Sequence, residues 1–161
     1  MKDGDVKASG VSQFREATME LDQVHSLFSR ACRLSEPEYW SLLLVYEGIR
    51  TQSEISAQLS MSRQTLNSAF RQLVKKGLIR LKIREGDLRS KQAFLTEDGK
   101  QFVETYIIRM HRLEEEARLL LEEEERAALV AATGKYSGLL RELLQNSLRG
   151  TGFRIRENTP E

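Results

Sequence analysis

The sequence is poor in cysteine, proline and continuous apolar stretches. It has one cysteine, which excludes an internal disulfide and agrees with a reducing compartment. No apolar run reaches the roughly 18 residues that would span a bilayer, and no signal-peptide core follows the polar start Met1–Asp5. We therefore expect a cytoplasmic protein with no membrane partner.

The chain also has almost no net charge, at +1, which by itself argues against a strongly basic nucleic-acid binder. The charges are unevenly placed, however. Residues 50–91 hold ten bases and three acids, a net +7, whereas residues 98–126 hold five bases and nine acids, a net −4. A basic block beside an acidic one is typical of a protein in which one module faces phosphate and another does not.

Apolar residues recur with helical spacing near both ends of the chain. The pattern predicts a first helix over residues 12–31 with Ser12 as its N-cap. Thr96 is predicted to cap a long helix over residues 97–119, and a last helix is predicted over residues 122–148. These helices carry more apolar surface than isolated helices can bury, which favours a partner.

The middle of the chain has the pattern of a helix-turn-helix. Ser35 followed by Pro37 predicts the start of a largely apolar core helix that ends at Gly48. A short helix capped by Ser53 and a second helix capped by Ser62 are joined by three residues, which is the layout of this motif.

A hairpin is predicted directly after the second of these helices. Residues 78–83 alternate apolar and basic side chains, Gly86–Asp87 supplies a turn, and residues 92–95 return as the second strand. A hairpin in this place is a wing. The predicted fold class is therefore mainly α with a small β wing, a winged helix-turn-helix embedded in a helical dimerisation scaffold.

The predicted domain plan follows from these elements. Residues 35–96 form the winged helix-turn-helix, and residues 12–34 with 97–148 form the helical dimerisation region. Residues 1–11 and 149–161 are predicted to be flexible tails.

The helix that starts at Ser62 has two separable faces. Its apolar face is predicted to be buried and consists of Leu66, Ala69, Phe70 and Leu73. Its other face carries side chains with the donors and acceptors that read base edges in the major groove, and its start can meet phosphate. The predicted DNA-binding residues are Ser62, Arg63, Gln64, Thr65, Asn67, Ser68, Arg71 and Lys75.

The wing supplies a second predicted contact. Arg84, Arg89 and Lys91 surround the hairpin tip, where an extended arm can enter the minor groove. Asp87 is close enough in sequence to brace Arg89 or a neighbouring base, although its role as a turn residue explains it equally well.

Several segments together resemble the MarR (multiple antibiotic resistance regulator) family. They are residues 53–66 and 73–79, the wing segment Asp87-Leu88-Arg89-Ser90, and the junction Leu95-Thr96-Glu97-Asp98-Gly99, within a likeness that covers residues 12–148. The resemblance implies a homodimer whose first and last two helices interlock. A two-fold dimer would bind double-stranded DNA at a pseudo-palindromic site with half-sites about 10 bp apart.

The resemblance also implies a regulator, more often a repressor, that an effector releases from DNA. In similar proteins a cleft between the dimerisation helices and the DNA-binding module takes small aromatic or phenolic effectors, and Tyr39 and Trp40 are candidates to face it, unless they belong to the core. Some relatives sense peroxides through a cysteine on the first helix. Cys32 is the redox candidate here, with Arg30 and Arg33 placed to lower its pKa, and a small buried hydrophobe is the alternative.

Other functions have less support in the sequence. His111 with Glu114 makes one i,i+3 pair, and His25 stands apart, so no metal or cofactor is predicted. No nucleophile–base arrangement or phosphate loop is visible, so no enzyme is predicted. The competing hypotheses are a winged-helix protein-interaction module that does not touch DNA and a redox-sensing regulator based on Cys32.

Overall fold

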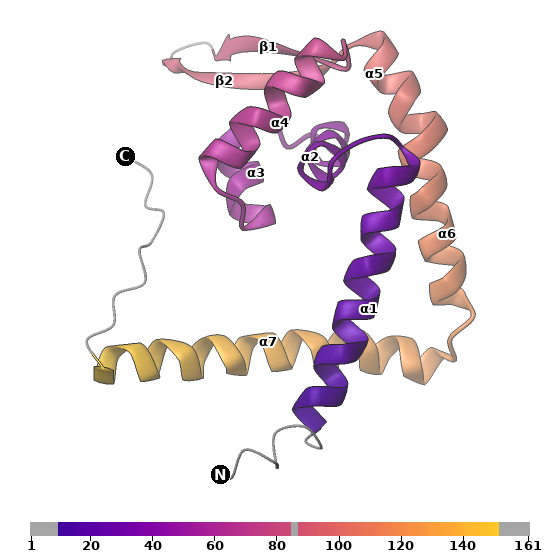
Figure 1. Cartoon of the computed structure of the whole chain (residues 1–161), viewed down its shortest axis with the longest axis vertical. Coiled ribbons are helices and arrows are strands. Elements are labelled where there is room, and N and C mark those ends of the chain that lie inside the picture. Colours follow the sequence, from indigo (N-terminus) through magenta and orange to yellow (C-terminus); the bar gives the residue numbers. More distant parts are fainter. Residues whose placement is uncertain (1–9, 85–86, 152–161) are drawn as a thin grey trace. The chain divides into compact units, whose positions relative to one another are not determined.

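Helices make up most of the described residues, and the hairpin of β1 and β2 interrupts them (Figure 1). The computed structural model describes residues 10–84 and 87–151, except the side chains at 84, 87–90 and 150–151. The elements are α1 (Gly10–Ala31), α2 (Glu36–Tyr46), α3 (Gln52–Leu59), α4 (Arg63–Lys75), β1 (Ile79–Arg84), β2 (Asp87–Leu95), α5 (Glu97–Phe102), the π-helical segment η1 (Val103–Ile107), α6 (Ile108–Leu119) and α7 (Glu123–Thr151). This order confirms the predicted fold class of a mainly α chain with a small β wing and a winged helix-turn-helix.

The chain divides into two compact units, one ending at Met110 and one beginning at His111. The first unit holds the helix-turn-helix, the hairpin and the buried core. Within the described ranges, no helix has both the length and the apolar character to cross a membrane.

Helix α2 is the centre of the first unit, as predicted. It contacts α1, α3, α4, β2 and η1, and Tyr39, Leu42 and Val45 are buried along it. The helix starts at the predicted place, where the Ser35 backbone N–H donates to the Glu38 carboxylate at 2.7 Å. It ends before Gly48, whose φ of +98° is a backbone conformation that favours glycine.

Helix α3 begins two residues earlier than predicted, so the prediction of Ser53 as its cap was wrong. The N-cap is Thr51, whose hydroxyl accepts from the Glu54 backbone N–H at 3.3 Å, while the Glu54 carboxylate accepts from the Thr51 N–H at 3.2 Å. In this reciprocal capping box the two side chains accept from the backbone N–H groups of Thr51 and Glu54. A cap at Ser53 would leave these N–H groups without a partner. Ile55 then points inward and is fully buried.

The turn into α4 has the predicted form. Ser60 takes a left-handed conformation with φ of +51°, and the Ser56 hydroxyl donates to the Met61 carbonyl at 2.7 Å. Ser62 caps α4, because its hydroxyl accepts from the Thr65 N–H at 3.1 Å. The four apolar residues predicted to face the core are all buried: Leu66, Ala69, Phe70 and Leu73.

The hairpin is longer than predicted on its second strand. Strand β2 starts at Asp87 rather than at Gln92, and Asp87 pairs with Arg84 as the last pair of the register, so the strand includes a residue that was predicted for the turn. Residues 85–86, which include the predicted turn residue Gly86, lie outside the described residues. Ile79 is 2% exposed but Ile83 is 57% exposed, because the hairpin leaves the core along its length.

Helix α1 does not start at its predicted cap, whereas α5 does. Helix α1 begins at Gly10, so Ser12 lies inside it and is not its cap. Thr96 caps α5 as predicted, with its hydroxyl accepting from the Gly99 N–H at 2.9 Å. The single long helix predicted after Thr96 is interrupted by η1, where Val103 and Ile107 are fully buried.

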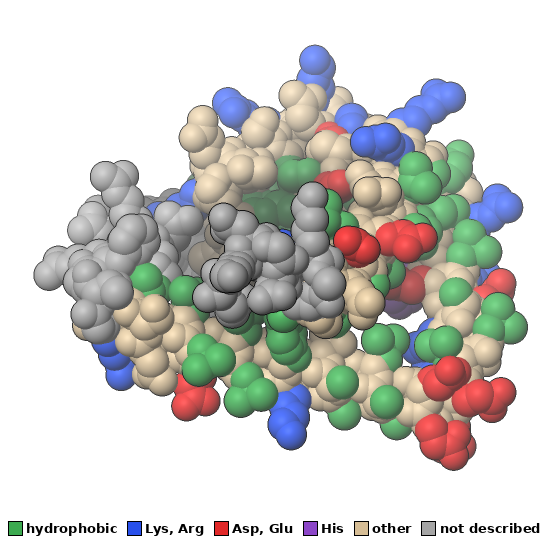
Figure 2. Space-filling model, turned by 60° about the horizontal axis from the view of Figure 1, so that its bottom comes forward, with side chains coloured by type: hydrophobic (Ala, Val, Ile, Leu, Met, Phe, Trp, Pro, Cys, Tyr) green, Lys and Arg blue, Asp and Glu red, His purple; other side chains and the backbone are tan. Residues whose placement is uncertain are grey.

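The second unit consists mainly of α7. The helix extends to Thr151, so residues 149–151, predicted as part of a tail, are helical, whereas residues 152–161 and 1–9 lie outside the described residues. Several large apolar side chains of α7 are at least 39% exposed, namely Leu129, Val130, Tyr136, Leu139, Leu140, Leu143 and Leu144. Figure 2 shows hydrophobic side chains at the surface between charged ones.

Candidate nucleic-acid interface

The exposed face of α4 carries the side chains predicted to read DNA. Gln64, Asn67, Ser68, Arg71 and Lys75 are all exposed, on the side of the helix away from its buried apolar residues. Amide and guanidinium groups present paired donors or acceptors, which match the edges of adenine and guanine in the major groove. The structure therefore brings these five predicted residues onto one accessible surface.

The first turn of α4 combines an N-cap with an exposed basic side chain that can contact phosphate. The hydroxyls of Ser62 and Thr65 lie 2.8 Å apart and hydrogen-bond to each other, while Arg63 is exposed beside them. Because the helix N-terminus bears partial positive charge, an anion is favoured there. The Ser62 and Thr65 hydroxyls are already engaged in the cap, whereas the Arg63 side chain takes no part in it.

Electrostatics favour an anionic partner for this face. Helix α4 contains no acidic residue, and in the described part of the chain no carboxylate lies within ion-pairing distance of Arg63, Arg71 or Lys75. Unpaired exposed bases attract a polyanion and make its binding dependent on salt.

The wing is described only in part. Lys91 is exposed on β2, opposite Ile83 in the register. The backbones of Arg84, Asp87 and Arg89 lie in the strands, and their side chains lie outside the described residues. The proposed wing contacts of these three side chains therefore stay predictions.

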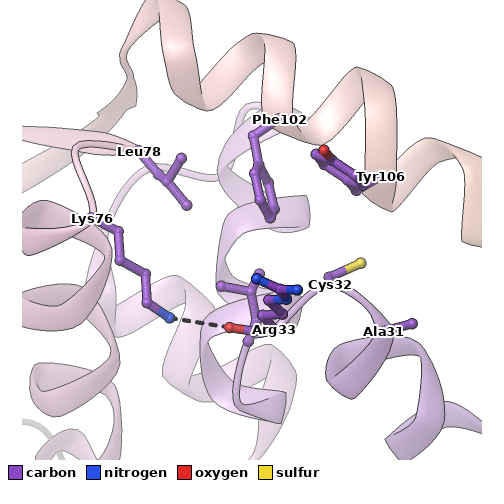
Figure 3. A pocket seen from close by; sticks show the side chains of 8 residues that line it. Ala31, Cys32, Arg33, Lys76, Leu78, Phe102 and Tyr106 are labelled. Atoms are coloured by element: carbon purple, nitrogen blue, oxygen red, sulfur yellow. Dashed lines mark hydrogen bonds between the residues drawn. The ribbon is translucent and has the colours of Figure 1, made fainter.

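A cavity of about 700 Å³ lies inside the first unit, at the corner between α1 and α2. Figure 3 shows Phe102 and Tyr106 reaching into it from one helix and Lys76 from the end of α4. The described residues that line it are Ala31, Cys32, Arg33, Leu34, Lys76, Leu78, Phe102 and Tyr106. The wall is mainly apolar and aromatic, with the exposed cation Arg33 beside Lys76, whose ammonium is already paired with the Glu38 carboxylate.

The predicted effector residues are not part of this cavity. Tyr39 is 2% exposed and packs edge-on against Trp40, with 5.0 Å between ring centroids. Neither residue lines the cavity. Sequence reasoning missed Phe102 and Tyr106 as lining residues because only the fold brings them next to the end of α1.

An ion pair joins the first turn of α2 to the C-terminal end of α4. The Lys76 ammonium donates to the Glu38 carboxylate at 2.7 Å and to the Arg33 carbonyl at 3.5 Å, which Figure 3 shows as a dashed line. Burial alone would raise the pKa of Glu38, but hydrogen bonds from Lys76 and Ser35 outweigh it and hold that pKa below its ordinary value. The pair fixes the C-terminus of α4 against the start of α2.

Cys32 is a poor thiolate in this setting. Its side chain is 6% exposed, and burial raises the pKa of its thiol. The expectation that Arg30 and Arg33 lower this pKa was wrong, because desolvation dominates. Burial of this kind is typical of a cysteine that packs as a small hydrophobe.

The histidines have other partners than a metal. The His25 ring packs at a tilt against Phe28 and edge-on against Trp40, each at a centroid distance of 5.8 Å, and His111 Nδ1 lies 3.5 Å from Glu114 Oε2. Across the residues that the structure describes, no three His, Cys, Asp or Glu side chains gather as a metal site would require.

Comparison with known proteins finds a family model that matches the helix-turn-helix segment. Residues 34–90 match the model of the MarR family. The winged-helix segment is similar to the MarR family over these residues. The resemblance predicted from the sequence is thereby confirmed for the segment that carries α2, α3, α4 and most of the hairpin.

Solved MarR-type structures share the fold of nearly the whole chain. MepR of S. aureus in complex with DNA is 24% identical, with a TM-score of 0.68, and the match covers 82% of this chain and 98% of MepR. CouR bound to a 23-mer DNA duplex is 21% identical with a TM-score of 0.69, covering 85% and 98%. PcaV from Streptomyces coelicolor, in complex with its natural ligand, is 18% identical with a TM-score of 0.66, covering 86% and 98%. No curated protein sequence matches the chain significantly.

Proposed function

We propose that this protein is a sequence-specific transcriptional regulator that binds double-stranded DNA and acts as a repressor. The observation that carries the proposal is the exposed face of α4, where Gln64, Asn67 and Arg71 stand on a helix whose other side is anchored in the core. A rigid helix with such a face fits the major groove. MepR and CouR, which share the fold, were solved on DNA.

The regulator works as a homodimer in this proposal. Helix α1 exposes large apolar side chains, among them Val11, Met19 and Leu27, at 52–57%. Helix α7 exposes a comparable series in the second unit. Water-exposed apolar surface of this kind on a folded chain favours a partner. Two copies related by a two-fold axis would present two α4 helices to a pseudo-palindromic operator.

Release from DNA is assigned to a small organic anion in the cavity beside Lys76. The cavity combines the rings of Phe102 and Tyr106 with the guanidinium of Arg33, which forms no ion pair with a described carboxylate. PcaV was solved with its natural ligand, and BpsR of Bordetella bronchiseptica is described as regulated by 6-hydroxynicotinic acid. An effector must bind the DNA-incompetent state better, with a coupling of about 1–3 kcal/mol.

The test begins with selection of bound sites from a random duplex pool, followed by anisotropy titrations of the selected site at two salt concentrations. A selected motif with two-fold symmetry and half-sites about 10 bp apart is expected. Arg71→Ala should weaken binding by about 1–3 kcal/mol at the selected site and relax its sequence preference. Arg109→Ala removes an exposed base from α6 and serves as the matched control.

Two results would count against the proposal. Salt-independent absence of binding to any duplex would favour a protein-interaction module. Full affinity of Arg71→Ala, with intact folding, would show that α4 does not read the DNA.

A further inference from the structure

The hairpin has a second basic surface that the DNA-reading face does not include. In the strand register, Arg80 stands opposite Phe94 and Lys82 opposite Gln92, so these four side chains share one face of the sheet. Arg80 and Lys82 are exposed on it. The other face carries Ala93, which is fully buried against the core.

Arg50 is held against this outer face by backbone and ring contacts. The Ala93 N–H donates to the Arg50 carbonyl at 2.8 Å, which fixes the start of α3 beside β2. The Arg50 guanidinium then lies 4.4 Å from the centroid of the Phe94 ring, and the Lys82 ammonium lies 5.4 Å from it. Cation–π contacts of this length orient both cations around the ring.

Arg50 and Phe94 also line a shallow pocket of about 270 Å³. Its walls are Val45, Tyr46, Arg50, Arg80, Phe94, Leu95 and Lys100. Lys100 comes from α5, which follows the hairpin directly (Figure 1). Three basic side chains from three separate segments therefore meet at one hollow, and none of the described residues that line it is acidic.

These charges are not compensated within the described part of the chain. None of the described carboxylates forms an ion pair with Arg50, Arg80 or Lys100. Lys76 differs from these three residues, because its ammonium nitrogen lies 2.7 Å from a carboxylate oxygen of the buried Glu38. The pocket thus keeps three like charges close together, an arrangement that a multivalent anion stabilises.

We propose that this pocket binds a phosphate group. Two guanidinium groups and one ammonium supply the forked and single donors that phosphate oxygens accept, and phosphate carries more charge than a carboxylate. The described lining of the pocket includes no residue of α4, so the pocket does not share a residue with the predicted base-reading face. The phosphate is either part of a small diphosphate ester or a backbone phosphate of DNA.

Titration of the full-length protein with inorganic pyrophosphate tests the first source. Calorimetry at constant ionic strength, with sodium sulfate as the comparison, should show one pyrophosphate per chain. The double variant Arg80→Gln with Lys100→Gln should weaken that binding at least tenfold, and Arg109→Gln should leave it unchanged. Circular dichroism verifies that both variants fold. This arm does not depend on DNA binding, so it stands even if the proposed regulatory function fails.

The second source is tested on DNA. With a duplex longer than the operator, the double variant should lower the slope of log affinity against log salt by about 1–2, because up to two phosphate contacts are lost. Loss of slope without pyrophosphate binding assigns the pocket to the DNA backbone. If pyrophosphate does not bind and the slope is unchanged, the proposal is wrong. It is also wrong if pyrophosphate binds equally well to the double variant.

Discussion

Gly99→Ala should unfold the junction between the hairpin and α5. A Cβ at residue 99 would overlap the Leu78 carbonyl oxygen and lie 2.8 Å from the Leu78 carbonyl carbon. The oxygen cannot easily move, because it accepts from the Thr96 N–H at 3.1 Å. Thr96 is itself fixed, since its hydroxyl donates to the Gly77 carbonyl at 2.5 Å.

The expected change in the free energy of unfolding combines one stabilising and two destabilising effects. Alanine is favoured over glycine in a helix by about 1 kcal/mol. Overpacking against a fixed backbone costs about 1–3 kcal/mol, and here the upper end applies because the obstructing atoms are main-chain atoms. Displacement of Leu78 also removes the hydrogen bond from Thr96, at about 1 kcal/mol. The expected net loss in the free energy of unfolding is about 3 kcal/mol.

Urea unfolding followed by circular dichroism, at one fixed protein concentration, measures this loss. Gly134→Ala is the matched control, because a Cβ there meets nothing within 4 Å in the described structure and the residue lies inside α7. The control should gain up to about 1 kcal/mol. A Gly99→Ala protein within about 0.5 kcal/mol of the parent would refute the close approach to Leu78.

Three further outcomes are expected. Thr51→Ala should lower the free energy of unfolding by about 1 kcal/mol, whereas Ser53→Ala should change it by less than half of that, because Thr51 is the N-cap; equal losses would contradict this assignment. Glu38→Gln should cost about 1–2 kcal/mol at neutral pH, since Lys76 is itself partly exposed. Because the pKa of Glu38 is lowered on folding, its contribution is complete above the ordinary value of 4.5 and is lost as the pH falls through the lowered pKa, so parent and variant should converge in acid urea titrations. Cys32 should react with a thiol reagent at pH 8 far more slowly in the native protein than in urea, and equal rates would overturn its burial.

Local pattern was enough to predict the recognition helix. Its apolar residues recur at spacings of three and four, and each of them is buried. The cap of α3 was misplaced because Thr51 and Ser53 are both good capping residues. The Glu54 three residues after Thr51 was the available signal, since it completes a capping box.

Features that depend on distant residues were beyond the sequence. Glu38 and Lys76 are 38 positions apart, and nothing local indicates that they pair. The three cations of the phosphate pocket come from the start of α3, from β1 and from α5. The π-helical segment was also missed, because one extra residue per turn shifts the helical phase without changing the residue types.

The turn between α3 and α4 has a consequence for the kinetics of recognition. Ser60, in its left-handed conformation, and the bond from the Ser56 hydroxyl to the Met61 carbonyl hold the chain in one shape before any ligand arrives. A segment that is already ordered loses little conformational entropy when it docks. Encounters with DNA would therefore be limited by diffusion and orientation rather than by folding of the motif, and differences in affinity between operators would be found mainly in how long each complex lasts.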